Sequence, residues 1–350
     1  MNLYQRVKAL DKLGKILSSI GENGNWAGFD MGITEDEYNA LEDLTRRVHV
    51  FNGWFTEKEV KSSFKAWGKQ LSLENIEKWI KNYTLDDKGS NKEVGIIMAG
   101  NIPLVGFHDY LCCYVAGYKS KIKLSSDDDK LFPAVLNILN HFDSTVMERS
   151  EIVITQLKNI DGIIATGSNN TSRYFEQYFG KYPNIIRKSR TSVAIITGAE
   201  SEEDMQGLAN DVFAFYGLGC RNVTKVFLPK GYDLDNLFKA FFPFQYVSEN
   251  NKYANNYDYH KAVFMMEQYD LLENGFLIMK EDQSLHSPIG TLYYEYYSDA
   301  NSIQEHLKQF DENIQCVVSK KDIPFGKAQN PELWDYADNI DTMEFLLDLK

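Results

Sequence analysis

The sequence predicts an α/β fold with two units in series, each built on a parallel sheet covered by helices. Two observations predict it. From about residue 94 onward, short apolar runs typical of buried strands alternate with helical patterns. The chain of 350 residues is also long enough for two domains, at about 150 residues per domain. We expect a helical segment before this alternating part.

The first 85 residues have helical patterns. Apolar residues recur at helical spacing near the start of the chain, at Leu3, Val7, Leu10, Leu17 and Ile20. Thr34 with Glu37, and Thr56 with Glu59, have the spacing of capping boxes and predict the starts of two further helices. Polar, turn-forming residues 85–92 end this part of the chain.

The rest of the chain supplies the strands. Five apolar runs predict strands, namely VGIIMAG (94–100), KIKL (121–124), EIVITQL (151–157), DGIIATG (161–167) and SVAIITG (192–198). Helices are expected around 105–116, from about 130, and over 171–179. The aromatic run LYYEYY (292–297) resembles a further strand. Together with FFPFQY (241–246), it either lines a hydrophobic channel or packs in the core.

Charge and hydropathy exclude several classes of protein. Fifty acidic and 37 basic residues leave a net charge of −13, which argues against unaided binding to nucleic acid. No apolar run approaches the ~18 residues that a membrane-spanning helix needs. The N-terminal segment is interrupted by Lys8, Lys12 and Lys15, so it lacks the apolar core of a signal peptide. We therefore expect a cytoplasmic protein.

The four cysteines differ in their surroundings. Cys112 and Cys113 lie in an apolar run and Cys316 in a strand-like run, so all three are expected in the core. No spacing of cysteine and histidine predicts a metal site. Cys220 follows two glycines in GLGCRN (217–222), which lets the backbone approach a ligand and can expose the thiol. A nucleophilic Cys220 and a buried structural Cys220 both remain open at this stage.

Three more candidate segments follow predicted strands, where ligands bind in parallel α/β folds. In GNIPL (100–104), Asn101 is either an oxyanion-binding amide or a helix cap before a proline. Lysines and serines over 119–126 either hold a ribose or phosphate or form a solvated strand edge. The small-residue turn at 165–172 either cradles a pyrophosphate or is an ordinary capped turn.

Taken together and in order, these segments resemble the aldehyde dehydrogenase superfamily. They resemble most closely its acyl-CoA reductase branch, the LuxC-like fatty-acid reductases. The resemblance runs from about residue 50 onward, and its most specific parts are NGWFT (52–56), AGNIPLVGFHD (99–109), ATGSNNTSRYFEQYFG (165–180), GLGCRNV (217–223) and PFGKAQNPELWDYAD (324–338). It implies an aldehyde-dehydrogenase-like fold. Residues 1–190 would form the helical N-terminus and a Rossmann-like NADP(H)-binding domain, and residues 191–350 the α/β catalytic domain with a C-terminal segment.

The resemblance also assigns roles to single residues. Asn101 takes the position of the oxyanion-binding amide, and Cys220 that of the catalytic nucleophile. The segment KLSS (123–126) stands where the superfamily has KPSE, which places cofactor-binding residues at Lys123, Ser125 and Ser126. The turn TGSNN places Gly167 and Ser168 at the cofactor pyrophosphate.

Departures from the superfamily pattern refine the expected activity. Ser126 replaces the glutamate that commonly binds the ribose of NAD, which favours NADP(H). RKSRT (187–191) contains no carboxylate where the superfamily has a water-activating glutamate, which suits a CoA-dependent enzyme. QSLHSP (283–288) stands where the superfamily has EEIFGP, and the chain is shorter than typical members.

The activity implied by the resemblance is reduction of a fatty acyl-CoA to the aldehyde by NADPH, through a thioacyl intermediate on Cys220, with CoA as the leaving group. A homo-oligomer and a partner enzyme that consumes the aldehyde are compatible with this activity, although no pattern in the sequence assigns either of them. Two alternatives remain. In the first alternative, the reductase takes its acyl group from an acyl carrier protein thioester or from an acyl phosphate. In the second, the chain is a degenerate family member that acts as an interaction subunit.

Overall fold

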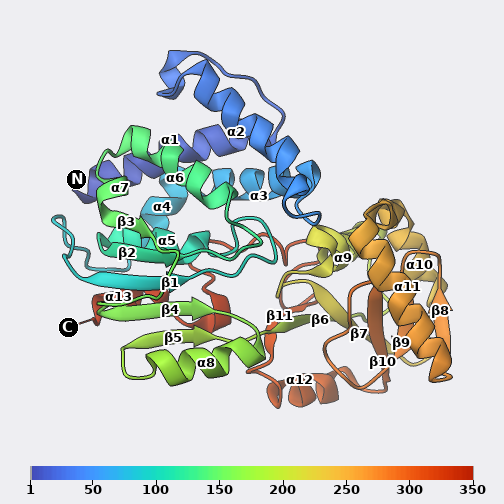
Figure 1. The fold of residues 1–350 in the computed structure, drawn as a ribbon. Coiled ribbons are helices and arrows are strands. Elements are labelled where there is room, and N and C mark those ends of the chain that lie inside the picture. Colours follow the sequence, from blue (N-terminus) through green and yellow to red (C-terminus); the bar gives the residue numbers. More distant parts are fainter. Residues whose placement is uncertain (1, 350) are drawn as a thin grey trace. The chain divides into compact units, whose positions relative to one another are not determined.

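The computed structural model describes residues 2–349 and divides them into two compact units. The first unit runs up to Lys188 and also includes the chain from Glu332 onward, while the second is Ser189–Pro331. Each unit contains a mainly parallel sheet with helices, and helices alone precede the first strand (Figure 1). The predicted α/β class with a helical N-terminal segment is therefore confirmed.

The N-terminal segment consists of α1 (Leu3–Gly21), α2 (Glu35–Arg47), α3 (Glu57–Gln70) and α4 (Leu73–Ile80). The predicted capping box at the start of α2 is present, because Thr34 and Glu37 each accept a hydrogen bond from the other's backbone N–H. Helices α1 and α3 pack closely at Gly68, where a Cβ atom would lie 2.5 Å from the backbone nitrogen of Ser18. Only glycine permits this approach.

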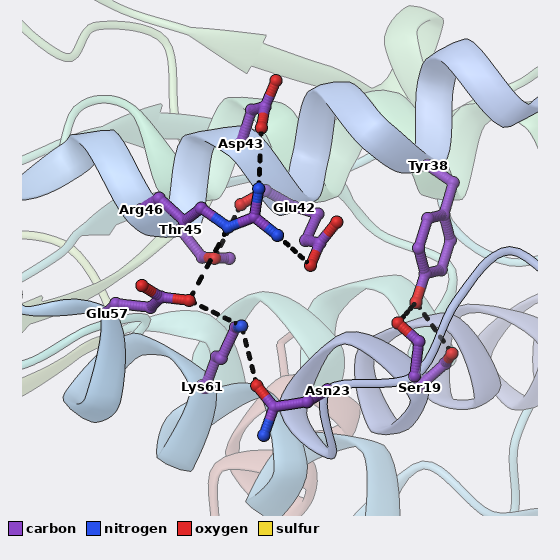
Figure 2. A network of polar contacts seen from close by, with 10 residues as sticks. Ser19, Asn23, Tyr38, Glu42, Asp43, Thr45, Arg46, Glu57 and Lys61 are labelled. Carbon is purple, nitrogen blue, oxygen red and sulfur yellow. Dashed lines mark hydrogen bonds and ion pairs between the residues drawn. The ribbon is translucent and has the colours of Figure 1, made fainter.

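Figure 2 shows the polar network that joins α2 to α3. The Arg46 guanidinium contacts Glu42 at 2.6 Å and reaches Glu57, at the start of α3, at 3.7 Å. Glu57 also pairs with the Lys61 ammonium at 2.6 Å, and Lys61 donates a hydrogen bond to Asn23 at 2.8 Å. The network thus connects α2, α3 and the turn after α1.

The first sheet has the order β3-β2-β1-β4-β5, with every pairing parallel. Its strands are β1 (Glu93–Ile97), β2 (Lys119–Lys123), β3 (Ser150–Ile152), β4 (Gly162–Thr166) and β5 (Asn184–Arg187). The helices of this part are α5 (Phe107–Ala116), α6 (Leu131–Phe142), α7 (Val146–Arg149), α8 (Asn169–Phe179) and α13 (Thr342–Leu347). The predicted strand 151–157 is wrong after Ile152, because β3 is an edge strand and the chain turns away, leaving Ile154 92% exposed.

Alternating residues of the first sheet face two separate clusters. Ile122, Ile96, Ile164 and Ile185 are aligned across four neighbouring strands and join the large core that includes α1, α5 and α6. Residues of the opposite parity, such as Ile163 and Ala165, pack with Phe175 and Phe179 of α8. The sheet is therefore covered on both faces, as parallel sheets require.

The C-terminal segment completes the first unit. The Trp79 indole N–H donates to the Tyr336 hydroxyl at 2.7 Å, and the Tyr118 hydroxyl donates to the Leu346 carbonyl at 2.6 Å. The buried Arg187 guanidinium pairs with Asp109 at 2.7 Å and donates to Thr342 at 2.8 Å. These bonds fix α13 and the chain before it against α4, α5 and β5.

The second sheet has the order β11-β6-β7-β10-β9-β8 and is parallel except for the pair β8–β9. Its strands are β6 (Thr191–Ile195), β7 (Val223–Pro229), β8 (Leu271–Glu273), β9 (Ile278–Glu281), β10 (Thr291–Tyr297) and β11 (Ile314–Val318). The helices are α9 (Glu202–Phe213), α10 (Asp235–Phe241), α11 (Asn251–Met266) and α12 (Ala300–Lys308). The predicted strand 292–297 is confirmed as part of β10.

The aromatic run 241–246 contributes to the core of this unit. Phe213 of α9 contacts Phe241 and Phe244 with ring centroids 5.5 and 5.4 Å apart, and Phe276 at 5.7 Å. Phe242 points outward instead and is 58% exposed. Within residues 2–349, no helix combines the length and the apolar character needed to cross a membrane.

Candidate functional site

Six of the seven predicted site residues follow the carboxyl ends of three neighbouring strands in the first unit. Asn101 comes after β1. Lys123 ends β2, and Ser125 and Ser126 follow it. Gly167 and Ser168 follow β4. Because β2, β1 and β4 are adjacent and parallel, these segments lie along one edge of the first sheet (Figure 1).

The turn after β1 carries Asn101 in an exposed position. Helix α5 begins only at Phe107 and its N-cap residue is Gly106, so the interpretation of Asn101 as a helix cap is wrong. Leu104 in this turn has a φ of 58°, a left-handed conformation that is strained for a leucine. A Cβ atom on Gly100 would lie 2.6 Å from the Ser125 Cβ, so glycine lets the turn approach the end of β2.

Asp128 holds the turn after β1, and the sequence analysis missed it. Its Oδ2 accepts a hydrogen bond from the Leu104 N–H at 2.9 Å. Burial raises the pKa of the Asp128 carboxyl to about 6. The run of three aspartates suggested only the start of a helix, which begins at Leu131. A contact between residues 24 positions apart leaves no local pattern.

The end of β2 presents a cation and two hydroxyls. The Lys123 ammonium donates to the Thr155 carbonyl at 3.4 Å, and no described carboxylate forms an ion pair with it. The Ser125 Oγ accepts the Asp127 N–H at 3.2 Å. Ser126 and Asp127 are both exposed. An unneutralised ammonium beside two hydroxyls suits a ribose or a phosphate.

The turn after β4 has the features of a pyrophosphate site and of a capped turn together. The Ser168 Oγ caps α8 by accepting the Thr171 N–H at 3.2 Å, and no acidic residue lies in the first turn of this helix. A Cβ atom on Gly167 would lie 2.9 Å from the Phe175 ring, so glycine allows α8 to start close to β4. The positive end of α8 therefore faces the sheet edge without a competing carboxylate, which fits a bound pyrophosphate.

Cys220 belongs to the second unit, between α9 and β7, and differs from the other three cysteines. Cys112, Cys113 and Cys316 are buried as predicted, whereas Cys220 is only partly buried. The interpretation of Cys220 as a buried core thiol is therefore wrong. Three consecutive residues before it, Phe215, Tyr216 and Gly217, have φ angles of 51°, 58° and 78°. Two of them are not glycine, so the backbone here is strained.

The buried Asn222 side chain holds this strained turn in place. Its amide nitrogen donates to the Asp211, Val212 and Ala214 carbonyls at 3.1, 3.2 and 2.8 Å. Its Oδ1 accepts the Gly219 N–H at 2.7 Å. Asn222 thus ties the end of α9 to the loop that carries Cys220, a positioning role that the sequence analysis did not assign.

The Ser192 hydroxyl contacts both the backbone of Cys220 and the side chain of Cys316. The Ser192 hydroxyl donates to the Cys220 carbonyl at 2.9 Å and lies 3.0 Å from the Cys316 sulfur. Burial raises the pKa of the Cys316 thiol, and hydrogen bonds from Ser192 and Arg221 partly oppose that rise. Arg221, which follows Cys220 in the sequence, thus acts on the buried Cys316 thiol.

Two further segments are also fixed within the second unit: 283–288, which departs from the superfamily pattern, and the start of 324–338, which matches it. The Thr224 hydroxyl of β7 donates to the Leu285 carbonyl at 2.7 Å, which holds 283–288 beside the strand. The buried Asp211 carboxylate accepts the Gly326 and Ala328 N–H groups at 2.7 and 3.1 Å, which holds 324–330 against α9. Burial raises the pKa of the Asp211 carboxyl to about 7.

Comparison with known proteins supports the fold and not a closer family. No protein family model matches the sequence, and no curated protein matches it. Solved structures do match. Aldehyde dehydrogenase 21 from Physcomitrella patens is 14% identical with a TM-score of 0.62, and 90% of this chain and 72% of that chain are covered. A putative aldehyde dehydrogenase, PutA, from Anabaena variabilis is 12% identical with a TM-score of 0.61, over 95% of this chain and 86% of that one.

A third match, the substrate-bound AldH of Staphylococcus aureus, is 14% identical with a TM-score of 0.52, over 88% of this chain and 74% of that chain. The first two solved structures are named as aldehyde dehydrogenases, and the third as AldH. The protein therefore has the aldehyde dehydrogenase fold.

Proposed function

We propose that this protein is an NADPH-dependent reductase that converts an acyl-CoA thioester, with a fatty acyl group as the expected substrate, into the aldehyde. The observation that carries the proposal is the partly buried Cys220, which follows a strained turn while the other three cysteines are buried. Strain held by surrounding contacts is common at functional sites. The aldehyde dehydrogenase fold and the order of the five matching motifs add support.

In the proposed first step, Cys220 takes the acyl group. Its thiolate sulfur bonds to the carbonyl carbon of the thioester, and the bond from that carbon to the CoA sulfur then breaks, so that CoA leaves. The negative charge that develops on the carbonyl oxygen is stabilised by the Asn101 side-chain amide and the Cys220 N–H. One such donor is typically worth about 3–4 kcal/mol of barrier.

The cofactor site is proposed along the carboxyl edge of the first sheet. NADPH, when bound, supplies the hydride that reduces the acyl carbon. Lys123 and Ser125 would bind the adenosine ribose, and the turn at Gly167 and Ser168 would bind the pyrophosphate at the N-terminus of α8. Ser126 leaves space for a 2′-phosphate and introduces no charge. Release of the aldehyde returns the free Cys220 thiol.

We propose that the acyl-enzyme is reduced and not hydrolysed by water. The segment 187–191 contains no carboxylate, and Arg187 at its start is engaged in the buried ion pair with Asp109. Without a general base to activate water, the thioacyl group would persist until reduction. We further propose that the protein works in the cytoplasm, forms a homo-oligomer, and passes the aldehyde to a second enzyme.

The proposal is tested by following NADPH absorbance with acyl-CoA substrates of increasing chain length, beside the variants Cys220→Ala and Cys316→Ala. We expect oxidation of NADPH and formation of aldehyde with the native protein and with Cys316→Ala, and neither with Cys220→Ala. Radiolabelled acyl-CoA should label the native protein and not Cys220→Ala. Turnover that survives in Cys220→Ala contradicts the nucleophile assignment, and NADH used better than NADPH contradicts the cofactor assignment.

The same assay decides the alternatives. Acyl phosphate and acyl carrier protein thioesters replace the CoA substrate in parallel reactions. Activity with only one of them would change the donor and keep the mechanism. A protein that is never acylated on Cys220 and never binds NADPH would instead be an interaction subunit.

A further inference from the structure

A cavity lies in the first unit, at the edge of the sheet opposite the proposed cofactor site. Its volume is about 260 Å³. It is bordered by Lys119 and Ser150, the first residues of β2 and β3, and by residues of α1, α5 and α7. These elements lie side by side near the N-terminus of the chain (Figure 1). The candidate residues Lys123, Ser125 and Gly167 are at the carboxyl ends of strands, so the cavity does not include them.

Positive charge dominates the wall of this cavity. Four cationic side chains line it, namely Arg6, Lys88, Lys119 and Arg149, against two carboxylates, Asp143 and Glu148. Neither Lys88, Lys119 nor Arg149 forms an ion pair with any carboxylate among residues 2–349. An excess of cations is notable in a protein with a net charge of −13, because it is not explained by overall composition.

The two arginines are held by backbone carbonyls, which fixes their positions. Arg149 Nη2 donates to the Ser90 carbonyl at 2.6 Å and to the Gly117 carbonyl, while no described residue accepts a hydrogen bond from its Nε or Nη1. Burial lowers the pKa of Arg6, and the nearby positive charge of Arg149 acts in the same direction. Two guanidinium groups that repel each other gain stability when an anion binds between them.

The carboxylate inside the cavity is already satisfied. Asp143 accepts hydrogen bonds from the Tyr114 hydroxyl at 2.9 Å and from the N–H and hydroxyl of Thr145 at 2.9 and 2.6 Å. The charge of the Asp143 carboxylate is therefore stabilised by hydrogen bonds from within the protein. Glu148 is exposed at the rim. Neither carboxylate neutralises the free donors of Arg149.

Aromatic rings form the remaining wall. Tyr110, Tyr114 and Tyr118 line the cavity, and their hydroxyls are hydrogen-bonded to Ser150, Asp143 and the Leu346 carbonyl. Their hydroxyls are thus already engaged with the protein, and the rings add apolar surface to the wall. Rings beside cationic donors suit a molecule with an anionic group and a carbon skeleton.

We propose that this cavity binds a small phosphate monoester. Arg149 and the two lysines would hold the phosphate, and the carbon skeleton would lie against the tyrosine rings. The cavity is somewhat smaller than the ~300–1,000 Å³ of pockets for drug-sized ligands, so a compound the size of a sugar phosphate fits better than a dinucleotide. This site is independent of the proposed reductase activity.

The test is titration calorimetry of the full chain with inorganic phosphate and with ribose 5-phosphate, at constant ionic strength with sodium chloride as the blank. We expect both to bind, and ribose 5-phosphate to bind more tightly because of its skeleton. The double variant Lys88→Gln with Lys119→Gln should weaken both by about tenfold or more. The matched control Lys69→Gln removes an exposed lysine outside the cavity and should bind like the native protein.

A third variant, Lys123→Gln, separates this cavity from the proposed cofactor site. Phosphate binding that is lost in Lys123→Gln and kept in the double variant would move the ligand to the cofactor site and overturn the proposal. Absence of binding by both probes overturns it as well, and so does equal weakening by Lys69→Gln. A melting temperature unchanged in the ligand-free double variant shows that the fold is intact.

Discussion

Asn101 illustrates how much of the proposed reaction depends on a single side chain. It is exposed on a strained turn that Asp128 holds from beneath through the Leu104 N–H. This bond fixes the backbone of the turn, and an amide carried on a fixed backbone needs less reorganisation when charge develops on the acyl oxygen, so such a donor acts mainly on the transition state.

We therefore predict that Asn101→Ala lowers kcat for thioester reduction on the order of 100- to 1,000-fold. The dissociation constant for NADPH should change little, because Asn101 is not among the proposed cofactor residues. Steady-state kinetics and a fluorescence titration of NADPH measure the two effects. A variant that loses NADPH binding but keeps kcat would assign Asn101 to the cofactor instead.

Asp211 gives a pH-dependent contribution to stability. Its folded pKa of about 7 lies well above the value of about 4 expected for an unfolded aspartate. The folded protein thus holds the proton more tightly than the unfolded chain does. The stability that this group contributes is fully present below about pH 4 and is lost as the pH rises through about 7.

We predict that the free energy of unfolding of the native protein falls relative to that of Asp211→Asn between about pH 4 and about pH 7. Denaturant unfolding at several pH values measures this difference. The exposed variant Asp235→Asn controls for the loss of one negative charge. If the difference in free energy of unfolding between the native protein and Asp211→Asn stays constant over this range, the argument from burial is contradicted.

The residues chosen as chemical candidates were accessible to sequence reasoning, whereas their supports were not. Burial of Cys112, Cys113 and Cys316 follows from the apolar runs around them. Asp128 and Asp211 act on backbone N–H groups 24 and 115–117 positions away in the chain. Such contacts depend on how the segments meet in three dimensions, which local spacing does not encode.

At the scale of the element, the turn between α9 and β7 combines backbone strain with a buried support, the Asn222 side chain. Asn222 donates to three carbonyls and accepts one N–H group, and its bonds to the Asp211 and Val212 carbonyls are buried. Leaving buried polar groups unsatisfied costs about 1–3 kcal/mol for each group.

We predict that Asn222→Ala lowers the free energy of unfolding by on the order of 3 kcal/mol, after partial relaxation of the loop. It should also slow acylation of Cys220 by acyl-CoA. The exposed variant Asn236→Ala serves as the control and should change neither quantity. Normal acylation in a destabilised Asn222→Ala would mean that the strained turn does not position the thiol.

Element boundaries were predictable where a strand is central and failed where it is at an edge. Strands β1, β4 and β6 are paired on both sides and start within one residue of the predicted apolar runs, although β1 and β6 each end three residues before the predicted run does. The edge strand β3 ends after three residues although its sequence continues with apolar residues. An edge strand is paired on one side, so fewer hydrogen bonds keep its backbone extended.

At the scale of the whole molecule, the ion pair of Arg187 and Asp109 joins parts of the first unit that are distant in sequence. Asp109 is in α5, Arg187 ends β5, and Thr342 begins α13. Both charged side chains are buried, with 3% and 7% exposure for Arg187 and Asp109. Removing one member would leave the other charge buried and unpaired.

We predict that Asp109→Leu lowers the free energy of unfolding by about 3–5 kcal/mol. The double variant Asp109→Leu with Arg187→Met should recover much of this loss, since no unpaired charge remains. Urea denaturation of the native protein, both single variants and the double variant completes the cycle. A double variant as unstable as the sum of the single ones would show that the two residues act independently.

The alternation of strands and helices predicts the α/β class. It does not predict that the chain returns to the first unit from Glu332 onward. The bond between Trp79 and Tyr336 joins residues 257 positions apart. The local pattern of residues 332–349 does not predict which surface this segment packs against, because a short amphipathic helix can pack on many surfaces.

This return has a consequence for how the protein is made. Met343 and Leu346 are fully buried in the core that contains α5, and a ribosome synthesises them only after the entire second unit. The nascent first unit therefore carries an open apolar face throughout the translation of residues 189–331. During that interval the unfinished surface is a natural client for a chaperone.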